Sequence, residues 1–420
     1  MEMKYRADQF GRLEFIKMAG ASLAGLSLFR SFPAGAAASN DLLVVIFLHG
    51  GCDGLNFVTP LKGPDRKIYE DERPNLQMPL TGPAALLPLN TDFGIHPSAK
   101  GLHQFFTEKR LAVVHAAGIN ANTRSHFDAQ NIIELGSDRV LDSGWLARTL
   151  LLAGGKSGLN SMTVGPLVPT SLASNKGSFS LTDINRLNLG GQGNLQDEQF
   201  DIVKSMYDQG NTWIHQAGNA TLESLKYLRD FKNRVATNPS RNDYPKTDLG
   251  GRMRTLAQLL RLGLDVPVAT LDMGGWDTHK YQGSGLDGVF AKQVEQLSQA
   301  VTAFTSDLET APKVEKKVTV LIMSEFGRRL RENANRGTDH GHGGVFFVLG
   351  PNVQGGKMHG KWPGLQTEKL YERADLAVTT DYRTVLTETA QGHFNLAKID
   401  TLFPGYKAKE TLGLFSKKVV

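Results

Sequence analysis

The sequence is poor in the features that mark disulfide-rich, nucleic-acid-binding and membrane-spanning proteins. It contains one cysteine, Cys52, in 420 residues, so an intramolecular disulfide is excluded and the core must hold the fold together. No polybasic run accompanies the formal net charge of +5, which argues against nucleic acid as a partner. The apolar run at residues 18–29 is too short to span a bilayer, so we expect no stable membrane span. None of these features specifies an oligomeric state.

The N-terminus has the composition of an export signal. Arg12 and Lys17 precede the apolar run, and the small residues AGAAAS follow it at 34–39. Basic, apolar and small residues in this order predict a signal peptide that is cleaved near Ala38.

The stretch GRLEFIK resembles a twin-arginine signal in which Leu13 replaces the second arginine. A weakened twin-arginine signal and an ordinary secretory signal both fit, and an uncleaved N-terminal helix is the third alternative. We expect an export signal peptide at 1–38 and a mature domain at 39–420, exported to a periplasmic or extracellular location.

Five apolar runs that end in glycine or polar residues are typical of strands buried on both faces of a sheet. They lie at 41–54, 110–118, 265–275, 317–327 and 343–350. Apolar residues at helical spacing occupy 96–110, 286–310 and 381–394, and Thr380 is the expected N-cap of the last helix. Strands that alternate with helices predict an α/β fold with a mainly parallel sheet.

The middle of the chain differs in composition. Residues 155–197 are rich in glycine, serine and asparagine, and residues 197–234 have a helical pattern. We interpret 155–235 as an insertion or a cap over the sheet.

Acidic residues and histidines follow the ends of several predicted strands, where open parallel sheets bind their ligands. Such groups repel one another or are desolvated unless a counter-charge is present, and a divalent cation supplies it. Mixed carboxylate and imidazole donors favour zinc, manganese or iron over calcium. The candidate metal ligands are Asp53, Asp272, Asp277, His279, Glu325, Asp339, His340 and His342.

Spacing supports this interpretation for two pairs. Asp277 and His279 are two residues apart, as are His340 and His342 in the glycine-rich stretch GTDHGHGG. In extended backbone this spacing directs both side chains to one side. A glycine-rich segment has great conformational freedom and needs additional interactions to order it, and a bound metal would supply them.

Polar residues also follow the second predicted strand. Ser125 could be a nucleophile at the start of a helix, and Arg124 could bind an anionic substrate through its planar guanidinium. The structural alternatives are an N-cap for Ser125 and a carboxylate partner such as Asp128 for Arg124. His126 is more often a satisfied, partly buried histidine than a base.

Other candidates have structural alternatives too. Cys52 could be a thiolate ligand, although a small buried residue at a strand end is commoner. Asp53 could cap the turn that follows it. Glu325 could pair with Arg328 on one helical turn.

The motifs LHGGCDGLN, RSHFDAQ, GGWDTH, SEFGR and TDHGHG occur in this order over nearly all of the mature chain. Together they resemble those of an exported bacterial family known as domain of unknown function number fifteen hundred and one. The resemblance implies the alkaline-phosphatase and sulfatase superfamily, with a doubly wound sheet whose strand ends carry metal ligands.

The resemblance also implies roles for individual residues. DMGGWDTH is similar to the alkaline-phosphatase segment E-G-G-R-I-D-x-x-x-H, with Asp272 for the magnesium ligand and Asp277 for a zinc ligand. Asp53 resembles an aspartate that bridges metals, and Ser125 resembles the nucleophile. SEFGR lies where the superfamily has an aspartate–histidine pair, and its Phe326 cannot coordinate a metal.

We therefore expect an exported metal-dependent hydrolase of phosphate or sulfate esters, with zinc or manganese as cofactor and a small anionic ester as substrate. A mutase or transferase of the same superfamily is a further possibility. The alternative from another class is a non-catalytic envelope protein that keeps the fold to bind a metal, ligand or partner. Phe326 favours this alternative, and the cluster of acids and histidines argues against it.

Overall fold

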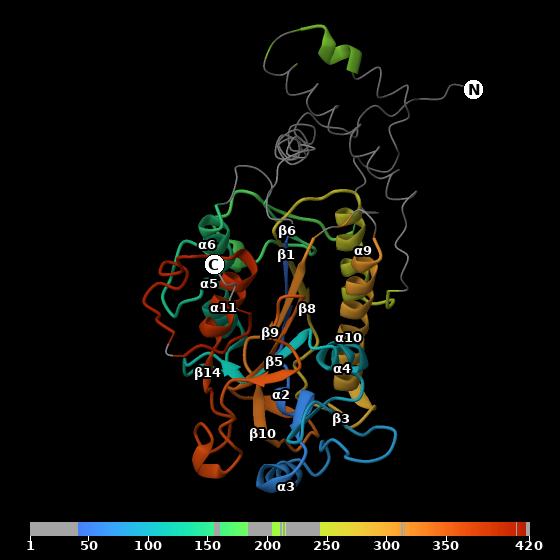
Figure 1. Cartoon of the computed structure of the whole chain (residues 1–420), viewed down its shortest axis with the longest axis vertical. Coiled ribbons are helices and arrows are strands. Elements are labelled where there is room, and N and C mark those ends of the chain that lie inside the picture. Colours follow the sequence, from blue (N-terminus) through green and yellow to red (C-terminus); the bar gives the residue numbers. More distant parts are fainter. Residues whose placement is uncertain are drawn as a thin grey trace, which may run out of the picture.

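A computed structural model of the chain contains one large central sheet between two layers of helices (Figure 1). It describes residues 41–154, 160–183, 204–210, 212, 215, 244–311, 314, 316–408 and 410–416. The predicted signal at 1–38 lies outside the described residues, as does most of the predicted insertion at 155–235.

The central sheet has the strand order β13-β5-β12-β9-β1-β8-β6-β7, with β14 also paired to β5. Among the described strands, β12 is antiparallel to both of its neighbours and every other pairing in this sheet is parallel. The strands are β1 (Leu42–Leu48), β5 (Leu111–Gly118), β6 (Ser161–Thr163), β7 (Ser178–Ser180), β8 (Val268–Met273), β9 (Val318–Ser324), β12 (Gly344–Leu349), β13 (Lys357–His359) and β14 (Thr380–Asp381).

Strand β1 shows why the central strands are apolar throughout. Its even-numbered residues, such as Val44 and Ile46, pack into one hydrophobic core, and its odd-numbered residues, such as Val45 and Phe47, pack into another. Side chains alternate across a strand, so a sheet covered on both faces needs apolar residues at every position.

Each face of the sheet has its own helix layer (Figure 1). The first layer consists of α4 (Lys100–Thr107), α9 (Asp248–Arg261) and α10 (Gly288–Glu309). The second layer consists of α5 (His126–Leu135), α6 (Trp145–Leu152) and α11 (Tyr382–Phe394). Helices on both faces of a mostly parallel sheet make this an α/β fold.

Smaller elements lie beyond the C-terminal edge of the sheet. A three-stranded sheet contains β2 (Val58–Pro60), β3 (Leu87–Pro88) and β4 (Phe93–Ile95), next to α2 (Gly54–Phe57) and α3 (Gly63–Glu72). The antiparallel pair β10 (Arg328–Glu332) and β11 (Thr338–His340) follows β9. Among the described residues, η1 (Thr170–Leu172) and η3 (Thr367–Lys369) are short 3-10 helices.

The expected α/β fold with a mostly parallel sheet is confirmed, with three differences in detail. The run at 343–350 forms β12, which is antiparallel because β11 returns the chain to the same end of the sheet. Asp381, not Thr380, caps α11 by accepting a hydrogen bond from the backbone N–H of Arg383. Residues 160–183 of the predicted insertion contribute β6 and β7 to the sheet.

Among the described residues, no helix combines the length and apolar character needed to cross a membrane.

Candidate metal centre

The candidate site lies where three neighbouring central strands end. Strand β1 pairs with β8 on one side and with β9 on the other, and all three are parallel, so their carboxyl ends meet at one edge of the sheet. The loop after β8 carries Asp277 and His279, the first residue after β9 is Glu325, and β11 ends at His340. The edge is the one at which open α/β sheets bind ligands.

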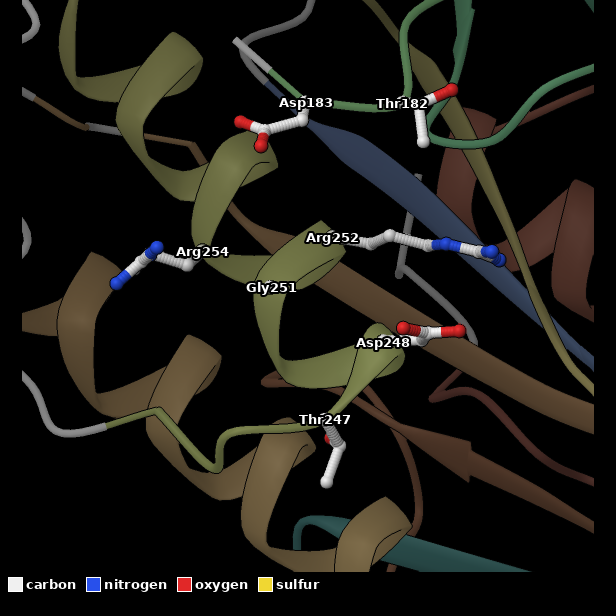
Figure 2. A pocket seen from close by; sticks show the side chains of 7 residues that line it. All are labelled: Thr182, Asp183, Thr247, Asp248, Gly251, Arg252 and Arg254. Atoms are coloured by element: carbon white, nitrogen blue, oxygen red, sulfur yellow. The ribbon is translucent and has the colours of Figure 1, made fainter. Parts of the chain in front are cut away.

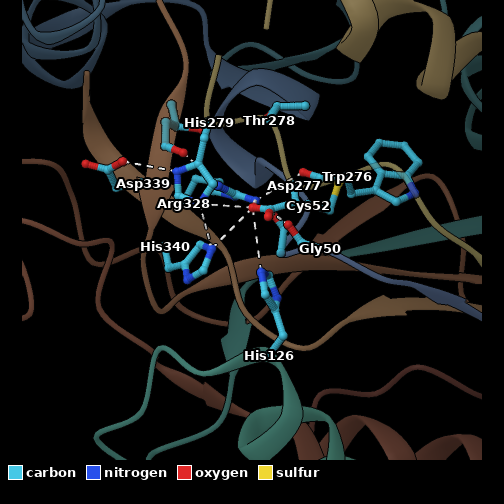
Figure 3. A network of polar contacts seen from close by, with 12 residues as sticks. Gly50, Cys52, His126, Trp276, Asp277, Thr278, His279, Arg328, Asp339 and His340 are labelled. Atoms are coloured by element: carbon cyan, nitrogen blue, oxygen red, sulfur yellow. Dashed lines mark hydrogen bonds and ion pairs between the residues drawn. The ribbon is translucent and has the colours of Figure 1, made fainter. Parts of the chain in front are cut away.

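Three imidazoles converge on the carboxylate of Asp277 (Figure 3). Its Oδ1 lies 3.1 Å from His279 Nε2, 3.2 Å from His340 Nε2 and 3.6 Å from His126 Nε2. His279 Nε2 and His340 Nε2 are 2.9 Å apart. His126 is the first residue of α5, so the helix layer supplies one imidazole, the loop after β8 supplies the second and the end of β11 supplies the third.

The second ring nitrogen of each imidazole has an acceptor. Nδ1 of His126 lies 2.6 Å from Glu325 Oε1, and Nδ1 of His279 lies 3.2 Å from Asp339 Oδ1. Nδ1 of His340 lies 2.7 Å from the backbone carbonyl oxygen of Arg124. Carbonyl and carboxylate oxygens accept only, so each Nδ1 carries the proton and donates it. When neutral, the rings therefore direct Nε2 lone pairs toward Asp277.

This donor set fits a divalent cation. His126 Nε2 is buried without a hydrogen-bond partner, and the facing Nε2 atoms of His279 and His340 need either an added proton or a cation between them. Ligand atoms bound tetrahedrally to zinc stand about 3.3 Å from one another, close to the separations here. The oriented Nδ1 atoms match the hydrogen bonding that supports metal-bound histidines in proteins.

A buried arginine joins the segments that carry the site. The guanidinium of Arg328 donates from Nε to the carbonyl of Gly51 and from Nη1 to that of Thr338, each at 2.6 Å. Its Nη2 donates to the carbonyl of Trp276 at 3.2 Å and to Asp277 Oδ1 at 2.5 Å. Arg328 thus holds the ends of β1, β8 and β11 together and compensates the charge of Asp277.

The surroundings shift the pKa values of three groups in the cluster. The hydrogen bond and charge of Glu325 raise the pKa of His126, whereas burial lowers the pKa of His340. Burial opposes ionisation of Asp277, but the hydrogen bond and charge of Arg328 outweigh it and lower the pKa of this carboxyl. Without an ion, a proton on the cluster therefore favours His126.

Glu325 is anchored behind His126. Its side chain is buried and accepts hydrogen bonds from the backbone N–H of Gly50 at 2.8 Å and from Ser324 Oγ at 2.9 Å. Gly50 has a φ of +119°, and a Cβ there would lie 2.4 Å from the backbone nitrogen of Asp277. The close approach of these two backbones requires glycine.

A sequence model of the family described as "Protein of unknown function (DUF1501)" matches residues 114–402, which is more than half of the chain. The chain belongs to this family. The matched region includes all four residues of the cluster, and Asp53 lies N-terminal to it. No curated protein matches the sequence.

The structure brings three of the eight predicted ligands together, namely Asp277, His279 and His340. Two others, Glu325 and Asp339, lie behind imidazoles as hydrogen-bond acceptors.

The remaining three predicted ligands have partners elsewhere. Asp53 is fully buried, and its Oδ2 accepts hydrogen bonds at 2.6 Å from both Arg73 and Gln282. Asp272 Oδ1 lies 2.9 Å from His49 Nε2.

The other predicted histidine of the glycine-rich stretch, His342, has Nδ1 2.9 Å from the buried carboxylate of Asp375. Side chains two residues apart do point the same way on extended backbone, but β11 ends at His340, and the chain bends at His342.

Ser125 and Arg124, which were predicted to be catalytic, both form hydrogen bonds or ion pairs within the fold. Ser125 Oγ caps α5 by accepting a hydrogen bond from the backbone N–H of Asp128 at 3.4 Å. The Arg124 guanidinium pairs with Asp375 at 2.7 Å and with Glu372 at 2.6 Å, while its backbone carbonyl orients His340.

Sequence reasoning did not include His126 among the ligands. The signal was its position directly after a residue able to cap a helix, at the end of the loop that follows a buried strand. A helix that begins at the carboxyl edge of the sheet directs its first side chains toward that edge.

A cavity of about 380 Å³ lies along α9, separate from the histidine cluster (Figure 2). Its wall includes Arg252, which donates to the backbone carbonyl of Asp272 at 2.9 Å. None of the three clustered imidazoles contributes to the lining, which consists of Thr182, Asp183, Thr247, Asp248, Gly251, Arg252 and Arg254.

Proposed function

We propose that this protein is an exported, metal-dependent hydrolase of phosphate or sulfate esters with the doubly wound fold of the alkaline-phosphatase and sulfatase superfamily. Asp277, His126, His279 and His340 would hold a divalent ion, zinc or manganese, and the three nitrogen donors favour zinc. One observation carries the proposal: three imidazoles with hydrogen-bonded Nδ1 atoms direct their Nε2 atoms at one carboxylate oxygen.

Solvent access supports a catalytic rather than a purely structural ion. The exposed fractions of the four side chains are 47% for Asp277, 38% for His279, 27% for His126 and 22% for His340. Structural zinc sites are closed by their ligands, whereas catalytic sites leave room for water and substrate.

A divalent ion bound here would supply Lewis-acid activation of water and of the ester. The residues of the chain prepare the site for it. Glu325 and Asp339 hold protons at Nδ1 of His126 and His279, which keeps both Nε2 atoms free. Arg328 compensates the charge of Asp277, so an anionic ester meets no uncompensated carboxylate there.

Water is the attacking group in this proposal. Ser125 Oγ is engaged at the N-terminus of α5, and the Arg124 guanidinium has two carboxylate partners. Both side chains therefore support the loop that presents His126 and the carbonyl that orients His340.

One observation favours a non-catalytic alternative. Four protein donors are enough to fill a tetrahedral zinc, which would leave a metal-binding envelope protein without hydrolase activity. Activity distinguishes the two directly.

The test compares turnover of chromogenic phosphate and sulfate monoesters by protein stripped with a chelator and then reloaded with zinc or manganese. The proposal predicts turnover only after reloading, and its loss in His126→Ala. His103→Ala is the matched control, because His103 is a partly exposed histidine outside the cluster that contacts the carbonyl of Pro88. Tight metal binding without turnover of either ester would replace the hydrolase with the envelope-binding protein.

A further inference from the structure

A single buried glutamine connects two of the three segments that carry the candidate ligands. Gln282 is fully buried, and both ends of its side-chain amide are hydrogen-bonded. Its Oε1 accepts from the hydroxyl of Thr278 at 2.7 Å and from that of Thr338 at 2.8 Å. Its Nε2 donates to Asp53 Oδ2 at 2.6 Å.

The two threonines adjoin the ligands. Thr278 lies between Asp277 and His279, and Thr338 begins the short strand β11 that ends at His340. The backbone N–H of Thr338 also donates to the carbonyl of Thr278 at 3.1 Å. This backbone bond and the shared acceptor of Gln282 therefore join the loop after β8 to β11, in addition to Arg328, which donates to Thr338 and to Asp277.

The amide nitrogen of Gln282 donates to Asp53, which belongs to a buried ion pair. Asp53 Oδ2 accepts from Gln282 and from the fully buried Arg73, which also donates to the carbonyl of Leu330 at 2.8 Å. A carboxylate accepts only, so the amide nitrogen must face Asp53 and the amide oxygen must face the threonines. The orientation of Gln282 is thus determined.

We propose that Gln282 is a positioning residue of the metal centre. Together with Arg328, it sets the distance between the pair Asp277 and His279 on one segment and His340 on the other, without itself contacting the ion. The proposal rests on the metal site of the proposed function, and it assigns the predicted ligand Asp53 to the support of Gln282. Ligand positions must be held within fractions of an ångström for tight binding, and outer residues that hold them change metal affinity 10–100-fold.

Cobalt(II) titration tests this inference, because the visible absorption of cobalt reports both its affinity and the geometry of its donors. Gln282→Met keeps the length of the side chain and removes both hydrogen-bonding groups. We expect its cobalt affinity to fall by about tenfold and its absorption spectrum to change.

Two further variants separate positioning from general destabilisation. Thr163→Val removes a buried hydroxyl pair with Thr270, 2.8 Å apart, in the central sheet away from the cluster. It should lower the melting temperature but leave cobalt affinity and spectrum unchanged. The double variant Thr278→Val, Thr338→Val should reproduce the loss seen in Gln282→Met, and combining all three substitutions should add little because they remove the same contacts.

Wild-type affinity and spectrum in Gln282→Met, or in the threonine double variant if the former does not fold, would overturn the positioning role while leaving the metal site intact. Folded wild-type protein that binds no cobalt would overturn the metal site itself, and with it this inference.

Discussion

Substitution of Asp53 by asparagine distinguishes a metal ligand from a structural residue. Asp53 and Arg73 are both fully buried, with 2.6 Å between Asp53 Oδ2 and Arg73 Nη1. Removing one charge of a buried ion pair leaves the other without compensation, which costs about 3–5 kcal/mol. Asparagine keeps one oxygen that can still accept from Arg73 and from Gln282, so we expect the lower end, about 3 kcal/mol.

A loss of about 3 kcal/mol should lower the melting temperature by roughly 4 °C, since an unfolding entropy of about 2.1 cal/mol/K per residue makes 1 kcal/mol correspond to about 1.3 °C in a domain of roughly 380 residues. Thermal unfolding followed by circular dichroism measures this shift, and elemental analysis of the same preparation measures bound metal. We expect a destabilised protein with unchanged metal content, because no imidazole of the cluster contacts Asp53 and the asparagine oxygen can still accept from Gln282, through which Asp53 supports the site.

The matched variant Arg73→Met removes the other partner and should destabilise the protein in the same way, again with the metal retained. The reasoning would be refuted by an Asp53→Asn protein that melts like wild type and has lost its metal. That result would restore Asp53 to the bridging role that the family resemblance implies.

Three further predictions concern the cluster and its surroundings. Ser125→Ala should lose a helix cap worth about 1 kcal/mol in thermal unfolding, with ester turnover close to wild type, and loss of turnover in folded protein would restore Ser125 as the nucleophile. Protonated His126 competes with an ion, and Glu325 raises the pKa of His126, so zinc affinity should keep rising with pH through and above the usual histidine range; in Glu325→Gln, calorimetric titrations should find the midpoint at lower pH. Chelation should lower the melting temperature, because an ion at 100 times its dissociation constant adds about 2.7 kcal/mol, and His126→Ala should show no such shift.

The sequence predicted the architecture well because apolar runs and helical periodicity are local properties. All five predicted strand runs form strands of the central sheet, and the three predicted helices are α4, α10 and α11. Strand direction is not encoded in such a run: GGVFFVLG is equally apolar in either direction, and only the path of the preceding pair β10 and β11 makes β12 antiparallel.

The candidate site was predicted in part, because the sequence locates a residue along the chain but not its partner. Asp277 and His279 share the loop between β8 and α10, and their two-residue spacing indicated a common direction. Asp53 was expected at the same edge, and it does follow β1. Its carboxylate accepts hydrogen bonds from Arg73, 20 positions away, and from Gln282, 229 positions away, and no local sequence pattern predicts either contact.

Glu325 and Asp339 show a second reason why the site was predicted only in part. A carboxylate beside an imidazole can bind an ion directly or hold the proton on the far ring nitrogen, and both uses produce the same sequence pattern. The outcome depends on which ring atom faces the carboxylate. Glu325 meets Nδ1 of His126, a residue that sequence reasoning interpreted as a satisfied histidine.

The most direct test of the account is elemental analysis of the purified mature protein beside His340→Ala and His342→Ala. These histidines are two positions apart in one glycine-rich stretch, yet His340 Nε2 lies 3.2 Å from Asp277 and His342 is bonded to Asp375. We expect near-stoichiometric zinc or manganese in the wild type and in folded His342→Ala, and its loss in His340→Ala. Metal that survives in His340→Ala, or a folded wild-type protein that takes up none, would contradict it.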